Sequence, residues 1–166
     1  LNPSSAASDV YKRQGMTNVC VMLNGEPTVV FSTTKSGDWV DRMSAVATGE
    51  PDSVVQVEKE AGGFVVGEPN ENPVLSAVAS YYERLIEYTA KQLSFALNGH
   101  KALPKFKHPI KIVVAGGTSQ ANGYIDKLKE KLNESVFPLE IQEIKHADDP
   151  LHAVSKGCLI AASILD

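Results

Sequence analysis

Apolar and polar positions follow two different patterns along the first hundred residues, one typical of strands and the other of helices. Val19–Leu23 and Thr28–Ser32 are short apolar runs on either side of Asn24-Gly25, which predicts a β-hairpin. Apolar residues then recur at helical spacing and are interrupted by glycine and proline. This pattern predicts three helices, Asp38–Thr48, Ser53–Ala61 and Val74–Leu97.

Strands and helices alternate in the second part of the chain. A polar, proline-containing connection at Asn98–Pro109 leads to Ile110–Ala115, a predicted buried strand that ends at Gly116-Gly117. Alternation of this kind favours parallel pairing, whereas the hairpin is antiparallel, so the sequence predicts an α/β domain with a mixed sheet. The remaining predicted elements are a helix over Ser119–Asn133, a strand over Leu139–Ile144, and a last helix capped by Asp149-Pro150 that continues through Leu151, Val154, Cys158 and Ala161.

Composition narrows the classes of protein that this chain can represent. It has 166 residues, 43% of them apolar, and its 16 basic and 20 acidic side chains give a net charge of −4, typical of one soluble domain. No basic run offers a surface for nucleic acid, and no apolar run could span a membrane. Cys20 and Cys158 lie in apolar stretches, so we expect reduced core thiols in a cytoplasmic protein. The histidines and cysteines show no metal-binding spacing.

Residues 1–14 differ from the rest of the chain. They have no apolar periodicity, and the string SSAASDVYKRQ resembles the conceptual translation of sequencing-adapter DNA at the end of a metagenomic reading frame. We therefore divide the chain into a foreign tail, 1–14, and one domain, 15–166. A native disordered arm is the alternative interpretation of the tail.

Two turns rich in small residues are the candidate binding elements, because the sequence has neither a P-loop nor a dinucleotide-binding glycine motif. Gly15-Met16-Thr17-Asn18 precedes a strand, and its glycine, hydroxyl and amide suit phosphate oxygens, although a plain tight turn explains it as well. Gly116-Gly117-Thr118 follows a strand and precedes a helix, where a ligand could lie against bare backbone and free N–H groups. A turn that serves packing alone is the alternative there.

Taken in order, these pieces resemble the second lobe of the actin-fold ATPases, the superfamily of actin, its bacterial and archaeal homologues, heat-shock chaperone ATPases and sugar kinases. Gly15-Met16-Thr17-Asn18 resembles the end of the second phosphate loop of the superfamily, and Ser36–Asp41 resembles the turn that opens its next helix. Ile112–Thr118 with Gly123 resembles its adenosine motif. The resemblance implies a ribonuclease H-like lobe that lacks its first strand.

The resemblance also implies ligands and residues that bind them. ATP or ADP, with Mg²⁺ in the complete protein, would be held by the residues of the two turns, by Gly37, and by Lys59 near the ribose. A solvated helix face explains the charges around Lys59 as well. We assign no catalytic residue and no metal ligand in this chain. The full set of cofactor-binding candidates is Gly15, Met16, Thr17, Asn18, Gly37, Lys59, Gly116, Gly117 and Thr118.

Three functions remain open for the parent protein. The first is a filament-forming prokaryotic actin homologue of the cytoskeleton or of DNA segregation, the second a chaperone or reactivating-factor ATPase, and the third a small-metabolite kinase. In each, the missing first lobe would complete the site, so this fragment alone is predicted to be inactive. The central strand of the sheet would lie just before Gly15. We therefore expect either residues around Asp9–Arg13 in its place or an unpaired sheet edge.

Overall fold

The computed structural model describes residues 15–99, 106 and 108–165. The hairpin forms as the Asn24-Gly25 pair predicts: β1 (Thr17–Leu23) runs antiparallel to β2 (Glu26–Thr33). Asn24 and Gly25 both have positive φ, 53° and 85°, as a tight two-residue hairpin turn requires. A register shift after Val21 marks a bulge. The predicted hairpin is confirmed.

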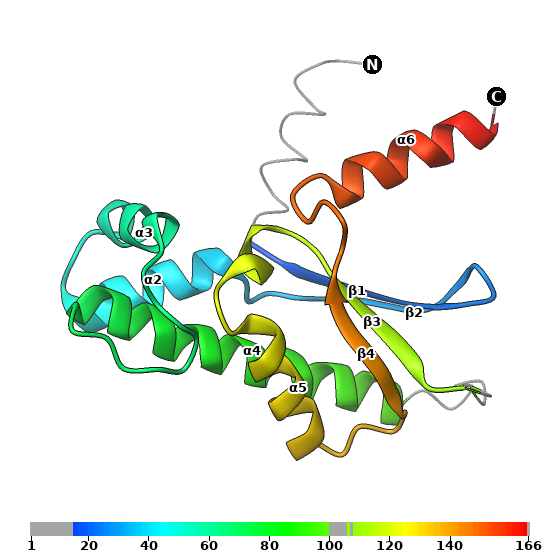
Figure 1. The fold of residues 1–166 in the computed structure, drawn as a ribbon, viewed down its shortest axis with the longest axis horizontal. Helices are drawn as coiled ribbons and strands as arrows, with labels where there is room; N and C mark the ends of the chain where they lie inside the picture. Colours follow the sequence, from blue (N-terminus) through cyan, green and yellow to red (C-terminus); the bar gives the residue numbers. More distant parts are fainter. Residues whose placement is uncertain (1–14, 100–105, 107, 166) are drawn as a thin grey trace.

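The long helix α4 (Pro73–Gly99) organises the core (Figure 1). α2 (Gly37–Thr48), α3 (Asp52–Ala61) and α5 (Tyr124–Glu134) pack against it. Val78, Leu85 and Ile86 are fully buried along its inner face, and Val40, Val55 and Leu132 meet them from the three neighbouring helices. The three helices predicted in the first hundred residues are confirmed within two residues at each end.

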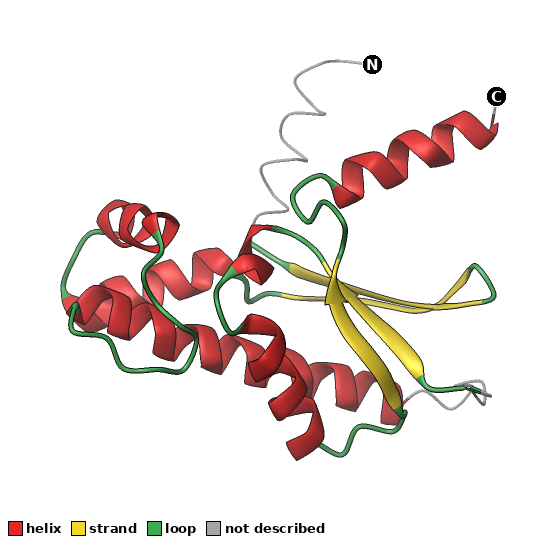
Figure 2. Ribbon diagram, viewed as in Figure 1, coloured by secondary structure: helices red, strands yellow, loops and turns green. Residues whose placement is uncertain are grey.

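Two strand pairs are formed by the described residues, and no third strand joins them. β3 (Ile110–Val114) pairs in parallel with β4 (Ile141–His146), while β1 pairs only with β2 (Figure 2). β1 and β3 therefore each keep an edge without a strand partner in the described part of the chain. This is one of the two expected outcomes for a lobe without its central strand. The other, residues Asp9–Arg13 in the gap, falls outside the described residues, as does the predicted tail.

Several predictions for the second half were wrong in detail. The helix predicted from Ser119 is a short 3₁₀ turn, η1 (Gly117–Gln120), followed by α5, because Gly123 adopts φ 81° and breaks the segment. The predicted strand Leu139–Ile144 forms two residues later, as β4. β3 is only half-buried, and Val113 is 56% exposed, because no described element covers its outer face.

The last helix and both cysteines also differ from expectation. α6 (Ala153–Leu165) begins three residues after Pro150 rather than at it, and its described side chains are exposed or half-buried because the helix projects away from the body (Figure 1). Cys158 lies on this helix and Cys20 on the outer face of the hairpin, so both thiols are free and exposed rather than in the core. None of the helices in the described ranges is long and apolar enough to cross a membrane.

Candidate functional site

Hydrogen bonds hold the Gly116-Gly117-Thr118 turn at the carboxyl end of β3. Gly116 adopts φ 95°, a conformation that side-chain-bearing residues rarely take, and its N–H donates to the carbonyl of Pro150 at 2.7 Å. The carbonyl of Gly116 accepts from the hydroxyl of Ser119 at 2.8 Å. Gly117 has ordinary φ, and a Cβ placed there would meet only Leu151, at 3.7 Å. Two hydrogen bonds thus hold Gly116, and Gly117 has room for a Cβ atom in ordinary contact with Leu151.

The start of α2 lies directly against this turn. A Cβ built on Gly37 would come within 2.9 Å of the Thr118 hydroxyl and 3.8 Å of the Lys59 ammonium. A Cβ on Gly15 would lie 3.7 Å from the carboxylate of Asp38, the next residue of the same helix. Segments distant in sequence thus meet at one place, and we call Gly15, Gly37, Lys59, Thr118 and the Gly116-Gly117 turn the glycine junction.

Lys59 enters the glycine junction as half of a buried ion pair. Its ammonium lies 2.7 Å from each carboxylate oxygen of Asp41 and donates a hydrogen bond to Oδ2. The side chains of Lys59 and Asp41 are only 14% and 11% exposed, so the face of α3 that carries Lys59 is not solvated. Burial raises the pKa of the Asp41 carboxyl, and the hydrogen bond and charge of Lys59 oppose that rise.

Two buried tyrosines have raised pKa values, and one of them, Tyr82, responds to the charge of Asp41. Burial, and after it the charge of Asp41, raises the pKa of Tyr82 well above its usual value. Burial alone raises the pKa of Tyr124 to about 12. Both phenols therefore stay protonated and uncharged at neutral pH.

The residues of the expected phosphate turn divide between the junction and the hairpin. Gly15 lies near the start of α2, whereas Thr17 and Asn18 already belong to β1. The Thr17 hydroxyl donates to the carbonyl of Lys35 at 2.9 Å, and the Asn18 amide oxygen accepts from Ser32 at 2.6 Å. Met16 is 39% exposed. The Asn18 oxygen is thus engaged across the hairpin, and the structure brings Gly15 rather than the whole turn to the junction.

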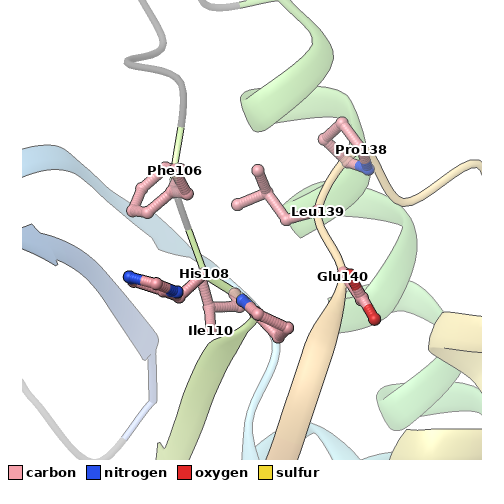
Figure 3. A pocket seen from close by; sticks show the side chains of 7 residues that line it. Phe106, His108, Ile110, Pro138, Leu139 and Glu140 are labelled. Atoms are coloured by element: carbon pink, nitrogen blue, oxygen red, sulfur yellow. The ribbon is translucent and has the colours of Figure 1, made fainter.

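Two cavities formed by described residues lie away from the glycine junction. One of about 170 Å³ is formed at the amino ends of β3 and β4, the edge opposite the glycine junction, and Phe106, His108, Leu139 and Glu140 are among its lining residues (Figure 3). The other lies beside Val54 and Val57 on α3. No residue of the glycine junction lines either of these two cavities. No group of three potential metal ligands occurs within the ranges 15–99 and 108–165.

The architecture matches a solved structure of the actin-like class. The ethanolamine utilization protein EutJ from Carboxydothermus hydrogenoformans, which has an actin-like ATPase fold, superposes with a TM-score of 0.58 at 17% identity. The match covers 83% of this chain and 42% of that one, so the chain spans less than half of the length of EutJ. The described residues thus share the fold of part of EutJ, a mixed α/β arrangement with small sheets.

The family itself comes from the sequence. The Volactin family model matches residues 10–162, and the chain belongs to the Volactin family. No curated protein matches it.

Sequence reasoning overlooked one charged residue of the junction. The sequence places Asp41 in the turn that opens its helix but does not identify it as the partner of Lys59, 18 residues away. A carboxylate at a core-facing helical position was the available signal, because such a residue almost always has a charged partner.

Proposed function

We propose that this chain is the nucleotide-binding half of an actin-like ATPase and that the glycine junction is its half of the ATP site. The observation that carries the proposal is the approach of Gly37 to Thr118 and Lys59, which assembles three predicted binding segments from different elements. Adenine and ribose would lie on the bare backbone at Gly116-Gly117. The phosphates would face Gly15 and the amino end of α2, whose free N–H groups favour an anion.

The donor chemistry of the junction fits the nucleoside better than the metal. A side chain at Gly37 would fill the space between α2 and η1, and Lys59 supplies hydrogen-bond donors suited to ribose hydroxyls. For Mg²⁺ the junction offers one exposed carboxylate, that of Asp38 near Gly15, since Asp41 is buried against Lys59, and one carboxylate is not a ligand set. We therefore assign Mg²⁺ to the complete protein, where the bound phosphates would contribute most of its ligands.

The exposed apolar surface supports a first lobe as the missing partner. On α6, Val154, Leu159 and Ile160 are 62–69% exposed, and on the outer face of the hairpin Met22 and Val30 are 51% and 68% exposed. A soluble domain seldom leaves so many large apolar side chains in water. We propose that a first lobe covers this surface in the complete protein, in the cytoplasm, where ATP is available and thiols stay reduced.

The proposal extends to filament formation in the complete protein. The connection between β2 and β3 holds three tightly packed helices and no large inserted domain among the described residues, as suits a protein whose partner is another copy of itself. ATP-dependent light scattering that rises with protein concentration would support this role. Nucleotide binding without any assembly would favour a chaperone or reactivating-factor ATPase instead.

Calorimetry with Mg-ATP tests the nucleotide site. With one wall present, we expect the 166-residue chain to bind with a dissociation constant of about 1 mM and to show no turnover. Gly117→Val should abolish binding without unfolding the chain, because the φ of Gly117 suits a side chain and a Cβ there meets only Leu151. Gly157→Val, at another open position on α6, is the matched control. Equal effects of the two variants, or micromolar affinity, would place the site elsewhere.

A further inference from the structure

Two cations and three aromatic rings form one chain of contacts between the β2–α2 loop, α2 and α4. The Lys35 ammonium lies 4.5 Å from the ring centre of Trp39 and 4.6 Å from that of Tyr88. The Trp39 ring meets Tyr81 edge to face at 5.7 Å, and the Arg84 guanidinium lies 5.1 Å from the ring centre of Tyr81. We call these five residues the cation–aromatic ladder.

The two cations of the ladder form no ion pair within the described part of the chain. The two α4 carboxylates nearest to Arg84 in sequence have other partners: Glu83 lies 3.6 Å from Lys127 and 3.4 Å from Lys131. Glu87 is paired with Lys91, which holds the pKa of Glu87 below its usual value, and the charge of Arg84 contributes less. The contacts of Lys35 and Arg84 are with ring faces, which leaves their charge available to an incoming carboxylate.

The composition of the ladder is that of a protein-binding surface. Tryptophan, tyrosine and arginine are the residues most enriched among those that dominate binding energy at interfaces. The surface continues beyond the ladder: Phe95, two helical turns after Tyr88 on the same side of α4, is 76% exposed. From Arg84 to Phe95 the helix offers about 16 Å of such surface, enough for several residues of an extended peptide.

We propose that the cation–aromatic ladder docks an acidic peptide segment of a partner protein, whose carboxylates pair with Lys35 and Arg84 while its apolar side chains lie on the rings of Trp39, Tyr81 and Tyr88. Charge complementarity selects this occupant, because the two cations of the ladder lie against aromatic rings and form no ion pair among the described residues, on a chain whose net charge is −4. The surface involves neither Gly37 nor Thr118, so the inference stands independently of the nucleotide site.

The test titrates the 166-residue chain into a fluorescein-labelled peptide of four Asp-Glu-Leu repeats and follows anisotropy, then repeats the titration with unlabelled peptide and tryptophan emission. Trp39 is the sole tryptophan of the chain, so its emission reports on the ladder itself. Arg84→Glu should weaken binding at least tenfold. Lys129→Glu, an equal charge change at an exposed α5 lysine outside the ladder, should change it less than twofold. Melting temperatures of both variants verify that they are folded.

Four results would overturn the proposal. The first is an absence of binding up to 1 mM peptide, on the order of the weakest affinity that the assay resolves. Equal weakening by Arg84→Glu and Lys129→Glu would show that net charge alone attracts the peptide. Unchanged Trp39 emission at saturation would place the peptide elsewhere. Sedimentation that shows self-association of the chain, lost in Arg84→Glu, would identify a second copy as the occupant.

Discussion

Replacing Lys59 by methionine should expose the cost of burying Asp41. The substitution keeps an apolar side chain of similar length but removes the ammonium that lies 2.7 Å from both carboxylate oxygens. With 11% of its side chain exposed, the Asp41 carboxylate would then be buried without a counter-charge. Breaking a buried pair from one side costs about 3–5 kcal/mol, and we expect that loss at pH 7.

The pH dependence of this loss follows from the direction of the pKa shift. Burial already raises the pKa of Asp41 in the folded chain, and Lys59→Met removes the two effects of Lys59 that lower it. A raised pKa means that the folded state binds the proton more tightly than the unfolded chain, so stability falls as pH rises from 3.8 through the folded pKa. The variant should therefore regain part of its stability at pH 5. Asp41→Asn, added to Lys59→Met, should restore most of it at pH 7.

Urea unfolding followed by circular dichroism, at pH 5 and pH 7, measures these free energies. Lys91→Met is the matched control, because Lys91 pairs with Glu87 on the surface of α4 with both side chains well exposed. An exposed pair of this kind contributes only about 0.3–0.5 kcal/mol. If Lys59→Met costs no more than Lys91→Met, or costs the same at both pH values, the reasoning about the buried pair is refuted.

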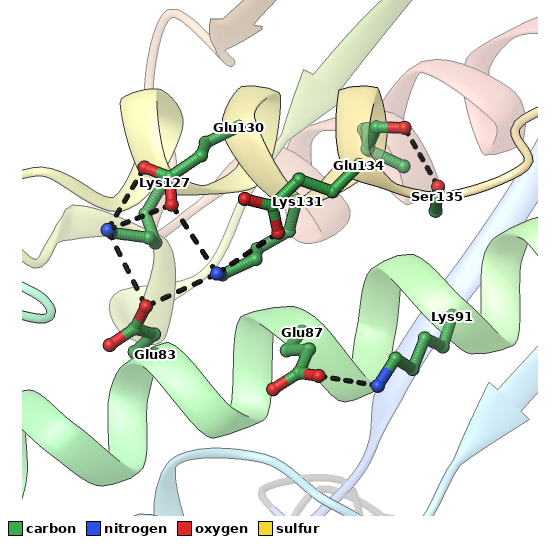
Figure 4. A network of polar contacts seen from close by, with 9 residues as sticks. Glu83, Glu87, Lys91, Lys127, Glu130, Lys131, Glu134 and Ser135 are labelled. Carbon is green, nitrogen blue, oxygen red and sulfur yellow. Dashed lines mark hydrogen bonds and ion pairs between the residues drawn. The ribbon is translucent and has the colours of Figure 1, made fainter.

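Three further changes probe other contacts. Gly37→Ala should destabilise the chain by about 1–3 kcal/mol in thermal melts, because its Cβ would come within 2.9 Å of the Thr118 hydroxyl; an unchanged melt would mean that η1 moves freely. Glu83→Gln removes the α4 carboxylate that Lys127 and Lys131 of α5 share (Figure 4). The free energy of unfolding should fall by about 0.5–1 kcal/mol in dilute buffer, and a loss that stays the same in 1 M salt would contradict its electrostatic origin. Hydrogen bonds from Lys156 and His152 lower the pKa of Asp149 to about 2. These contacts should therefore persist above pH 3.8 and weaken as the pH falls toward 2. If NMR shows that Asp149 titrates near pH 3.8, the contacts do not form in solution.

The regular elements could be predicted from the sequence because their signals are local. Asn24-Gly25 specifies the hairpin turn, and the helical spacing of apolar residues locates α2, α3 and α4 within two residues at each end. The start of α5 differs from the predicted helix because the backbone leaves helical geometry twice between η1 and α5, at Ala121 with ψ 135° and at Gly123 with φ 81°.

The contacts of the candidate site depend on tertiary packing, and the sequence indicated them only through the resemblance to a family. No spacing rule links Gly37 to Thr118 or Asp41 to Lys59, since each pair joins different elements. The burial of the cysteines was predicted wrongly for a related reason. Cys158 lies in an apolar stretch, but the described chain contains no element that covers α6, so its apolar side chains remain in water.

The proposed binding of nucleotide at the glycine junction is tested most directly by an NMR titration of the ¹⁵N-labelled 166-residue chain with Mg-ATP. Glycine amides resolve well, and saturation should require millimolar ligand, on the order of the expected dissociation constant. We predict that the amide shifts centre on Gly15, Gly37, Gly117 and Thr118 and that Gly25, at the distant hairpin turn, stays unchanged. Shifts confined to the cavity beside His108, or spread evenly over the surface, would contradict the assignment.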